Sequence, residues 1–97
     1  MVALITGASA GIGASYARQL AIKGTDLVLV ARSESRLNEL AQELITQHNI
    51  KIEVLTADLS DRSQLDKVAA RAAMDDVDLV INNAGFGINK SFLVSDI

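Results

Sequence analysis

The most chemically suggestive segment of this sequence holds three glycines close to its N-terminus, Gly7, Gly11 and Gly13. They follow the apolar run Val2–Ile5, which is typical of a strand buried on both faces, and they precede a stretch with helical spacing. Such a turn can bind phosphate, because it exposes backbone N–H groups and the helix N-terminus carries partial positive charge. We expect Gly7 to make the tight turn, Gly11 to admit a pyrophosphate and Gly13 to pack helix against strand.

Two motifs carry a resemblance to a known family. The first, TGASAGIG (residues 6–13), matches the pattern T-G-x-x-x-G-[IL]-G throughout and resembles the cofactor-binding motif of the short-chain dehydrogenase/reductase family. Its glycine spacing differs from the general dinucleotide fingerprint G-x-G-x-x-G. The second, NNAG (residues 82–85), resembles another signature of the same family and follows in the right order. The resemblance covers essentially the whole chain.

The alternation of apolar runs and helical stripes predicts an α/β, Rossmann-like three-layer sandwich. We expect four parallel strands in the order 3-2-1-4, with helices on both faces. The expected strands are 2–5, which Thr6 closes, 27–31, 51–57 and 77–82, and the expected helices are 12–23, 34–47 and one that starts at Ser60 or Asp61. Residues 1–97 would then form one domain, the dinucleotide-binding half of such a protein, with the catalytic half absent.

Composition narrows the class of protein. The chain is 49% hydrophobic with three aromatic residues, which indicates an aliphatic core of the kind that fills a parallel sheet. The net charge of −3, without a basic stripe, argues against nucleic acid as a partner. There is no cysteine, and the N-terminal apolar run is too short for a signal peptide or a membrane span. We expect a cytoplasmic protein with no membrane partner and no metal.

The end of the second strand bears on which cofactor is bound. An acid there would accept hydrogen bonds from the ribose hydroxyls of NAD, but Ala31 occupies that position. Arg32 offers a guanidinium that suits a phosphate, and Arg32-Ser33 looks like the NADP-preferring relatives, so NADP is expected over NAD. Ala10 departs from the pattern, because many such relatives carry a basic residue there. Arg32 as a solvated charge, and Arg36 as a further phosphate contact, are the alternatives.

The resemblance assigns further cofactor contacts downstream. Asp58 and Leu59 follow the third strand, where they would contact the adenine ring, although Asp58 could instead cap the next turn. The Thr6 hydroxyl is expected to tie back to the second motif, whose backbone would border the cofactor ribose. The full set of candidate cofactor-binding residues is Gly7, Ser9, Ala10, Gly11, Ile12, Gly13, Arg32, Ser33, Asp58, Leu59, Asn83, Ala84 and Gly85.

The residues that perform the family's reaction are not in this sequence. That chemistry uses a tyrosine with a lysine four residues later, since a phenol with its ordinary pKa near 10 is a poor base at neutral pH. The single tyrosine is Tyr16, and Leu20 stands four residues on, so we nominate no catalytic residue. The resemblance implies part of an NADP-dependent oxidoreductase acting on an alcohol or carbonyl, itself inactive. A non-catalytic nucleotide-binding module and a structural fragment are the alternatives.

Two further fold types that bind through a glycine-rich first loop fit less well. A methyltransferase-like domain would want an acid at the end of the second strand, where Ala31 and Arg32 stand, and a P-loop would need a Gly-Lys-Ser/Thr after Gly7. The expected sheet also leaves its fourth strand at an edge. Because Leu79–Ile81 would expose unpaired backbone groups beside apolar side chains, we expect a homodimer, unless residues 85–97 cover that edge.

Overall fold

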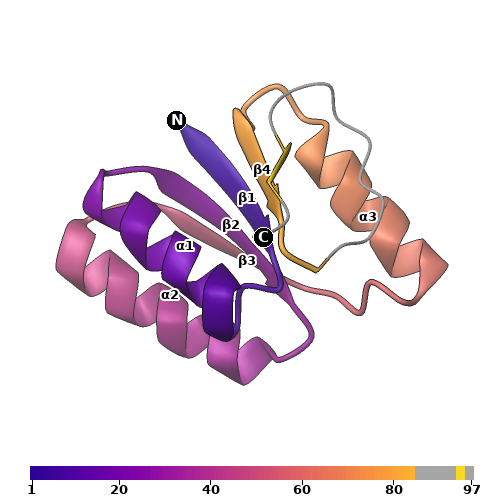
Figure 1. Ribbon diagram of the computed structural model, residues 1–97, viewed down its shortest axis with the longest axis horizontal. Coiled ribbons are helices and arrows are strands. Elements are labelled where there is room, and N and C mark those ends of the chain that lie inside the picture. The colour runs from indigo at the N-terminus through magenta and orange to yellow at the C-terminus, as the bar shows by residue number, and fades with distance from the viewer. Residues whose placement is uncertain (85–93, 96–97) are drawn as a thin grey trace.

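The computed structural model describes residues 1–84 and 94–95, and these form one parallel sheet with three helices (Figure 1). The elements follow in the order β1 (Val2–Thr6), α1 (Gly11–Ile22), β2 (Asp26–Ala31), α2 (Glu34–His48), β3 (Ile52–Thr56), α3 (Arg62–Ala72), β4 (Leu79–Asn82) and β5 (Val94–Ser95). The strand order is β3-β2-β1-β4-β5, with every pair parallel. The expected α/β fold and the order 3-2-1-4 of its first four strands are confirmed.

The sheet is built around β1, which pairs with β2 on one side and β4 on the other. Ile5, for example, lies opposite Leu29 of β2 and Ile81 of β4. Such a strand must be apolar on both faces, and Leu4 and Ile5 are fully buried although their side chains point to opposite faces. The carboxyl ends of β1, β2 and β3 therefore all meet at the same edge of the sheet.

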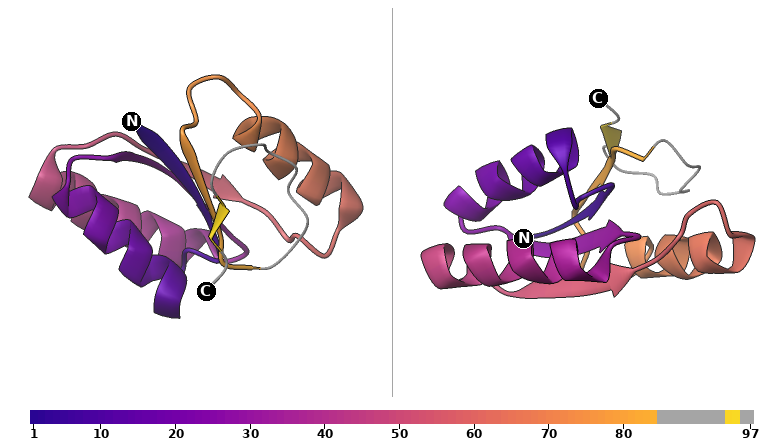
Figure 2. Two further views of the ribbon diagram at one scale, coloured as in Figure 1. Left: turned by 45° about the horizontal axis from the view of Figure 1, so that its top comes forward. Right: turned by 90° about the horizontal axis from the view of Figure 1, so that it is seen from below.

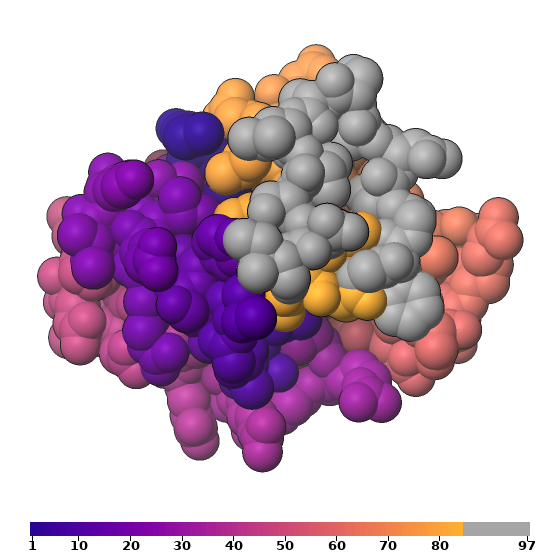
Figure 3. Space-filling view, in the orientation of Figure 1, coloured from indigo at the N-terminus to yellow at the C-terminus, as the bar shows by residue number. Residues whose placement is uncertain are grey.

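The helices divide between the two faces of the sheet. Helices α1 and α2 lie side by side on one face, and α3 lies on the other (Figure 1; Figure 2, left). In the space-filling view, the orange atoms of the segment that includes β4 are visible between the indigo and purple atoms of the N-terminal segment and the salmon atoms around the start of α3 (Figure 3). One core joins Ala3 and Ile5 to α1 and α2, whereas the other joins Leu4 to α3. The expected three-layer arrangement is thus present.

Local signals in the sequence explain where the helices begin and end. Ser33 caps α2, its side-chain oxygen accepting from the N–H of Arg36 at 3.4 Å. Asp61, not Ser60, caps α3, and its carboxylate accepts from the N–H of Ser63 at 2.9 Å. Gly24 follows α1 with φ +80°, a conformation that favours glycine at a helix end.

The far side of β4 is paired, contrary to the open edge expected from the sequence. Val80 pairs with Val94 and Ile81 pairs with Ser95 of β5. The expectation is therefore wrong at these two positions, because a later part of the chain supplies the backbone partners that an apolar edge strand recruits. Homodimer formation stays a prediction, but an unpaired edge at Val80 and Ile81 no longer supports it. No helix within residues 1–84 or 94–95 is long and apolar enough to cross a membrane.

The cap of α3 predicts a specific loss of stability in acid. Hydrogen bonds from Ser63 and Gln64 lower the pKa of Asp61 below its ordinary value. The charged carboxylate thus stabilises the fold above the unfolded-state pKa of about 4, and this contribution disappears as the pH falls through the lower folded-state pKa. Unfolding by urea at a series of pH values from 7 to 3 should show a smaller acid-induced loss in Asp61→Asn than in the wild-type chain. Because asparagine also caps helices, the variant should stay folded at pH 7, and an unchanged pH dependence would contradict the assignment.

Candidate functional site

The glycine-rich turn after β1 leaves the N-terminus of α1 open to an anion. Gly7 and Gly11 have φ values of +64° and +58°, which glycine adopts without strain. Ala10 stands at the N-cap of α1 and provides no side-chain hydrogen bond, and the first turn of the helix contains no acidic residue. A Cβ added to Gly11 would meet nothing within 4 Å. No side chain therefore caps the first N–H groups of α1, which a phosphate site requires.

The absence of side chains at Gly13 and Gly7 allows the turn to pack closely against neighbouring atoms. A Cβ on Gly13 would overlap the carbonyl oxygen of Gly7 and lie 2.8 Å from its carbonyl carbon. A Cβ on Gly7 would lie 2.9 Å from the side-chain nitrogen of Asn83. The turn is also anchored to β2, since the N–H of Ala8 donates to the carbonyl oxygen of Val30 at 3.1 Å. These contacts place the start of α1 directly above the end of β1.

Thr6 and Asn82 form a buried polar link between the ends of β1 and β4. The Thr6 hydroxyl donates to Oδ1 of Asn82 at 2.9 Å and accepts from the N–H of Ala84 at 3.1 Å. Asn83 adds a hydrogen bond from its side-chain nitrogen to the carbonyl oxygen of Gly7 at 3.4 Å. The expected tie between the Thr6 hydroxyl and the second motif is confirmed. Gly85, the last residue of that motif, lies outside the described residues.

Arg32 stands at the end of β2 with its side chain in the open. Ala31 before it is buried, Arg32 itself is exposed, and Ser33 after it caps α2. Within residues 1–84 and 94–95, the Arg32 guanidinium makes no hydrogen bond and no ion pair. No acidic side chain stands at this strand end to bind ribose hydroxyls, so the local chemistry favours an anionic ligand.

Asp58 and Leu59 follow β3 on the opposite side of the site. Oδ1 of Asp58 accepts from the hydroxyl and the N–H of Ser60, at 2.7 and 3.0 Å, so the carboxylate holds the next turn. These hydrogen bonds, and then the positive charge of Arg32, lower the pKa of Asp58 below its ordinary value. The N–H of Asp58 donates to Oε1 of Gln64 at 2.7 Å, which fixes the backbone from α3.

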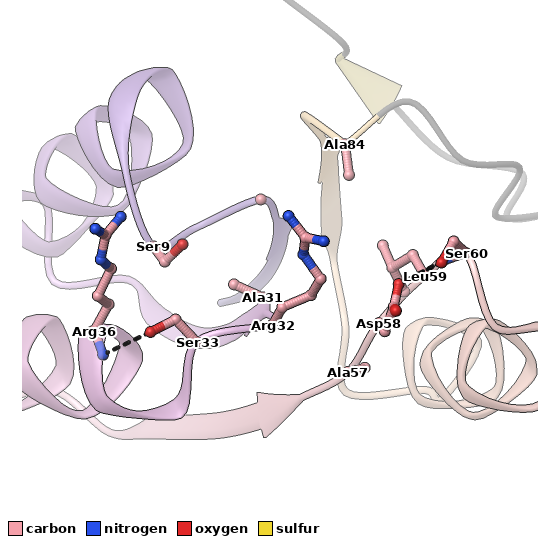
Figure 4. A pocket seen from close by; sticks show the side chains of 11 residues that line it. Ser9, Ala31, Arg32, Ser33, Arg36, Ala57, Asp58, Leu59, Ser60 and Ala84 are labelled. Carbon is pink, nitrogen blue, oxygen red and sulfur yellow. Dashed lines mark hydrogen bonds between the residues drawn. The ribbon is translucent and has the colours of Figure 1, made fainter.

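Side chains from these strand ends surround one cleft of about 790 Å³ (Figure 4). The expected site residues that line it are Gly7, Ser9, Arg32, Ser33, Asp58, Leu59 and Ala84. Four more residues line the cleft and were not in the candidate set, although Arg36 was named as an alternative phosphate contact: Ala31, Arg36, Ala57 and Ser60. The position of Ala31 and Ala57 beside the end of a strand is the signal that could have found these two. The expected residues that do not line it are Ala10, Gly11, Ile12, Gly13 and Asn83.

Comparison with known proteins decides the family. The family described as short chain dehydrogenase matches residues 1–96. This chain belongs to that family. Within it, the chain is 45% identical over 98 residues to a very-long-chain 3-oxoacyl-CoA reductase of the yeast Meyerozyma guilliermondii, covering 97% of this chain and 29% of that protein.

Solved structures of other short-chain dehydrogenases have the same fold over this length. A short-chain dehydrogenase from Sphingobium yanoikuyae, in complex with NADPH, is 44% identical with a TM-score of 0.83, covering 94% of this chain and 36% of that one. A bulky-bulky ketone specific alcohol dehydrogenase from Comamonas testosteroni is 43% identical with a TM-score of 0.83, covering 94% of this chain and 38% of that one. The chain thus spans about a third of the length of these relatives.

Proposed function

We propose that this chain is the NADP(H)-binding part of a short-chain oxidoreductase that moves a hydride between nicotinamide and an alcohol or carbonyl compound. The choice of NADP rests on Arg32, which lines the cleft and whose guanidinium has no hydrogen bond or ion pair with any described residue. At the end of β2, where an acidic side chain would bind the ribose hydroxyls of NAD, there is no acid. The Sphingobium relative in complex with NADPH supports the same choice.

An adenine dinucleotide would contact the cleft together with the glycine-rich turn and the second motif next to it. The pyrophosphate would lie over Gly11, at the open N-terminus of α1, where the helix favours negative charge. Arg32 would hold the 2′-phosphate of the adenosine ribose through a charge-assisted hydrogen bond. The backbone of Asn83 and Ala84, fixed by Thr6, would border the other ribose.

Asp58 and Leu59 would hold the adenine ring. Asp58 uses Oδ1 for Ser60, and its second oxygen, Oδ2, has no hydrogen-bond partner in the part of the chain that the structure describes. Oδ2 would accept a hydrogen bond from the exocyclic amine of adenine while Oδ1 keeps its two hydrogen bonds from Ser60. The two interpretations of Asp58, as a cap of the turn and as an adenine contact, are therefore compatible.

Bound NADPH would supply the hydride, but none of the described residues that line the cleft is a tyrosine that could move the matching proton. Tyr16 is half-buried and packs against the core under α1 and α2, and it is not among the residues that line the cleft. No tyrosine in the sequence is followed by a lysine four residues later. We therefore expect this chain to bind cofactor and to need further residues for the reaction.

Calorimetric titration of the 97-residue chain with NADPH and NADH tests the proposal. We expect NADPH to bind more tightly, because only NADPH carries the 2′-phosphate. The same preparation should not consume NADPH in the presence of ketones or aldehydes. Equal affinities, or tighter NADH binding, would contradict the cofactor assignment, and steady NADPH consumption would contradict the assignment of an inactive binding part.

A further inference from the structure

The five arginines of the chain fall into two groups. Three are paired with carboxylates: Arg18 with Glu43 at 3.2 Å, Arg62 with Asp66 at 3.2 Å, and Arg71 with Glu53 at 3.1 Å and Asp76 at 2.8 Å. The guanidinium groups of the other two, Arg32 and Arg36, have neither a hydrogen bond nor an ion pair with any described residue. Both of these arginines line the cleft.

We propose that Arg36 is a second residue that determines specificity for the 2′-phosphate, acting together with Arg32. This inference rests on the proposed function and assigns a role that Arg32 alone does not fill. A phosphate monoester carries a charge of about −1.5 to −2 near pH 7, so one guanidinium leaves it only partly neutralised. Arg36 supplies the second positive charge on the same cleft.

The geometry at the start of α2 supports this pairing. The N–H of Arg36 donates to the Ser33 hydroxyl at 3.4 Å, which fixes the backbone of Arg36 one turn beyond the end of β2. Figure 4 shows the Arg32 and Arg36 side chains extending in the same direction, toward the side of the cleft where Ser9 lies. An anion between them would receive charge-assisted hydrogen bonds from two elements, the end of β2 and the first turn of α2.

Arg36 also lines a second, neighbouring hollow. This hollow, of about 280 Å³, lies between α1 and α2 and is lined by Arg36 together with Glu39 and Glu43. Its carboxylates offer Arg36 an alternative ionic environment, although Glu43 already pairs with Arg18. Arg36 therefore lines both the cleft and a hollow that also contains Arg18, Glu39 and Glu43, and a phosphate bound in the cleft would draw its guanidinium toward Arg32.

The test uses ligands that differ only in the 2′-phosphate. Adenosine 2′,5′-bisphosphate and adenosine 5′-phosphate are titrated by calorimetry into the wild-type chain and into Arg36→Ala. We expect the variant to bind the bisphosphate about two- to fivefold more weakly, the range for exposed ion pairs, with no change for the 5′-phosphate. Arg36→Lys should retain part of the difference, since it keeps the charge and loses the planar fork.

Two further variants separate this role from general effects. Arg62→Ala removes the same charge from the first turn of α3, away from the cleft, and should leave both affinities unchanged. The double variant Arg32→Ala/Arg36→Ala should bind the two ligands equally. Because alanine is a better helix former than arginine and Arg36 is exposed, Arg36→Ala should keep the wild-type circular dichroism spectrum.

The outcomes distinguish this inference from the proposed function. If Arg32→Ala reduces the preference for the 2′-phosphate and Arg36→Ala does not, the role of Arg36 is overturned and the cofactor assignment stands. If the wild-type chain shows no preference for the bisphosphate, both are overturned. An equal loss for both ligands in Arg36→Ala would also overturn the inference, because it would show an effect unrelated to the 2′-phosphate.

Discussion

Replacing Arg32 with alanine is expected to weaken NADPH binding by about 1–3 kcal/mol and to leave NADH binding nearly unchanged. The reason is that Arg32 lies on the cleft without a hydrogen bond or an ion pair to any described residue, so its guanidinium can bind the 2′-phosphate. The measurement is calorimetric titration of both cofactors into the wild-type chain and the variant. The variant should then discriminate little between the two cofactors.

Arg32→Lys and a stability measurement complete this experiment. Lysine keeps the charge but cannot bind a phosphate with two parallel hydrogen bonds, so its affinity for NADPH should lie between those of the wild-type chain and Arg32→Ala. Arg32 is exposed, and neither substitution should change the urea midpoint of unfolding. A similar loss of affinity for NADPH and NADH would show that Arg32 does not act on the 2′-phosphate.

Gly13→Ala is expected to damage both the fold and the site. The new Cβ would overlap the carbonyl oxygen of Gly7, and backbone on both sides prevents an easy adjustment. We expect a loss of about 1–3 kcal/mol in the free energy of unfolding, typical of inserting a methyl group into a packed region. Because the start of α1 must move away from β1, NADPH affinity should fall as well. Urea unfolding and calorimetry measure the two effects.

Gly11→Ala and Gly24→Ala form a matched pair that tests the expected pyrophosphate site separately. Gly11 and Gly24 both have positive φ values, +58° and +80°, and open space around the added Cβ, so alanine should cause similar backbone strain of about 1 kcal/mol at each. Gly11 lies at the expected pyrophosphate site, whereas Gly24 lies at the other end of α1. Only Gly11→Ala should weaken cofactor binding, and an equal effect of Gly24→Ala would contradict the assigned site.

Features that depend on neighbouring residues could be predicted from the sequence. The apolar runs placed the first four strands to within a few residues, because a strand buried on both faces must be apolar throughout. The glycine pattern predicted three separate roles, and the positive φ of Gly7, the open space at Gly11 and the close packing at Gly13 agree with them. The sequence left the start of the third helix between Ser60 and Asp61, and the side-chain hydrogen bonds select Asp61.

Features that depend on distant parts of the chain could not be predicted in this way. The pairing of β5 with β4 joins residues 80–81 to residues 94–95, and a two-residue strand has no hydrophobic period to reveal it. The N–H of Asp58 donates a hydrogen bond to the side chain of Gln64 in the first turn of α3. This hydrogen bond depends on the path of the chain between β3 and α3, which the sequence pattern does not give. Arg36 looks like an ordinary exposed helix residue until the cleft and the neighbouring hollow place it between them.

The position of β1 in the sheet has a consequence for the order of folding. The first strand of the chain is flanked by β2, which follows after one helix, and by β4, whose residue Asn82 pairs with Thr6 across 76 positions of sequence. During synthesis, β1, β2 and β3 with α1 and α2 can assemble first, while β1 keeps one side unpaired until β4 leaves the ribosome. The nascent chain therefore carries an exposed apolar strand edge in the middle of its future sheet, and it is during this interval that chaperone binding or aggregation would compete with folding.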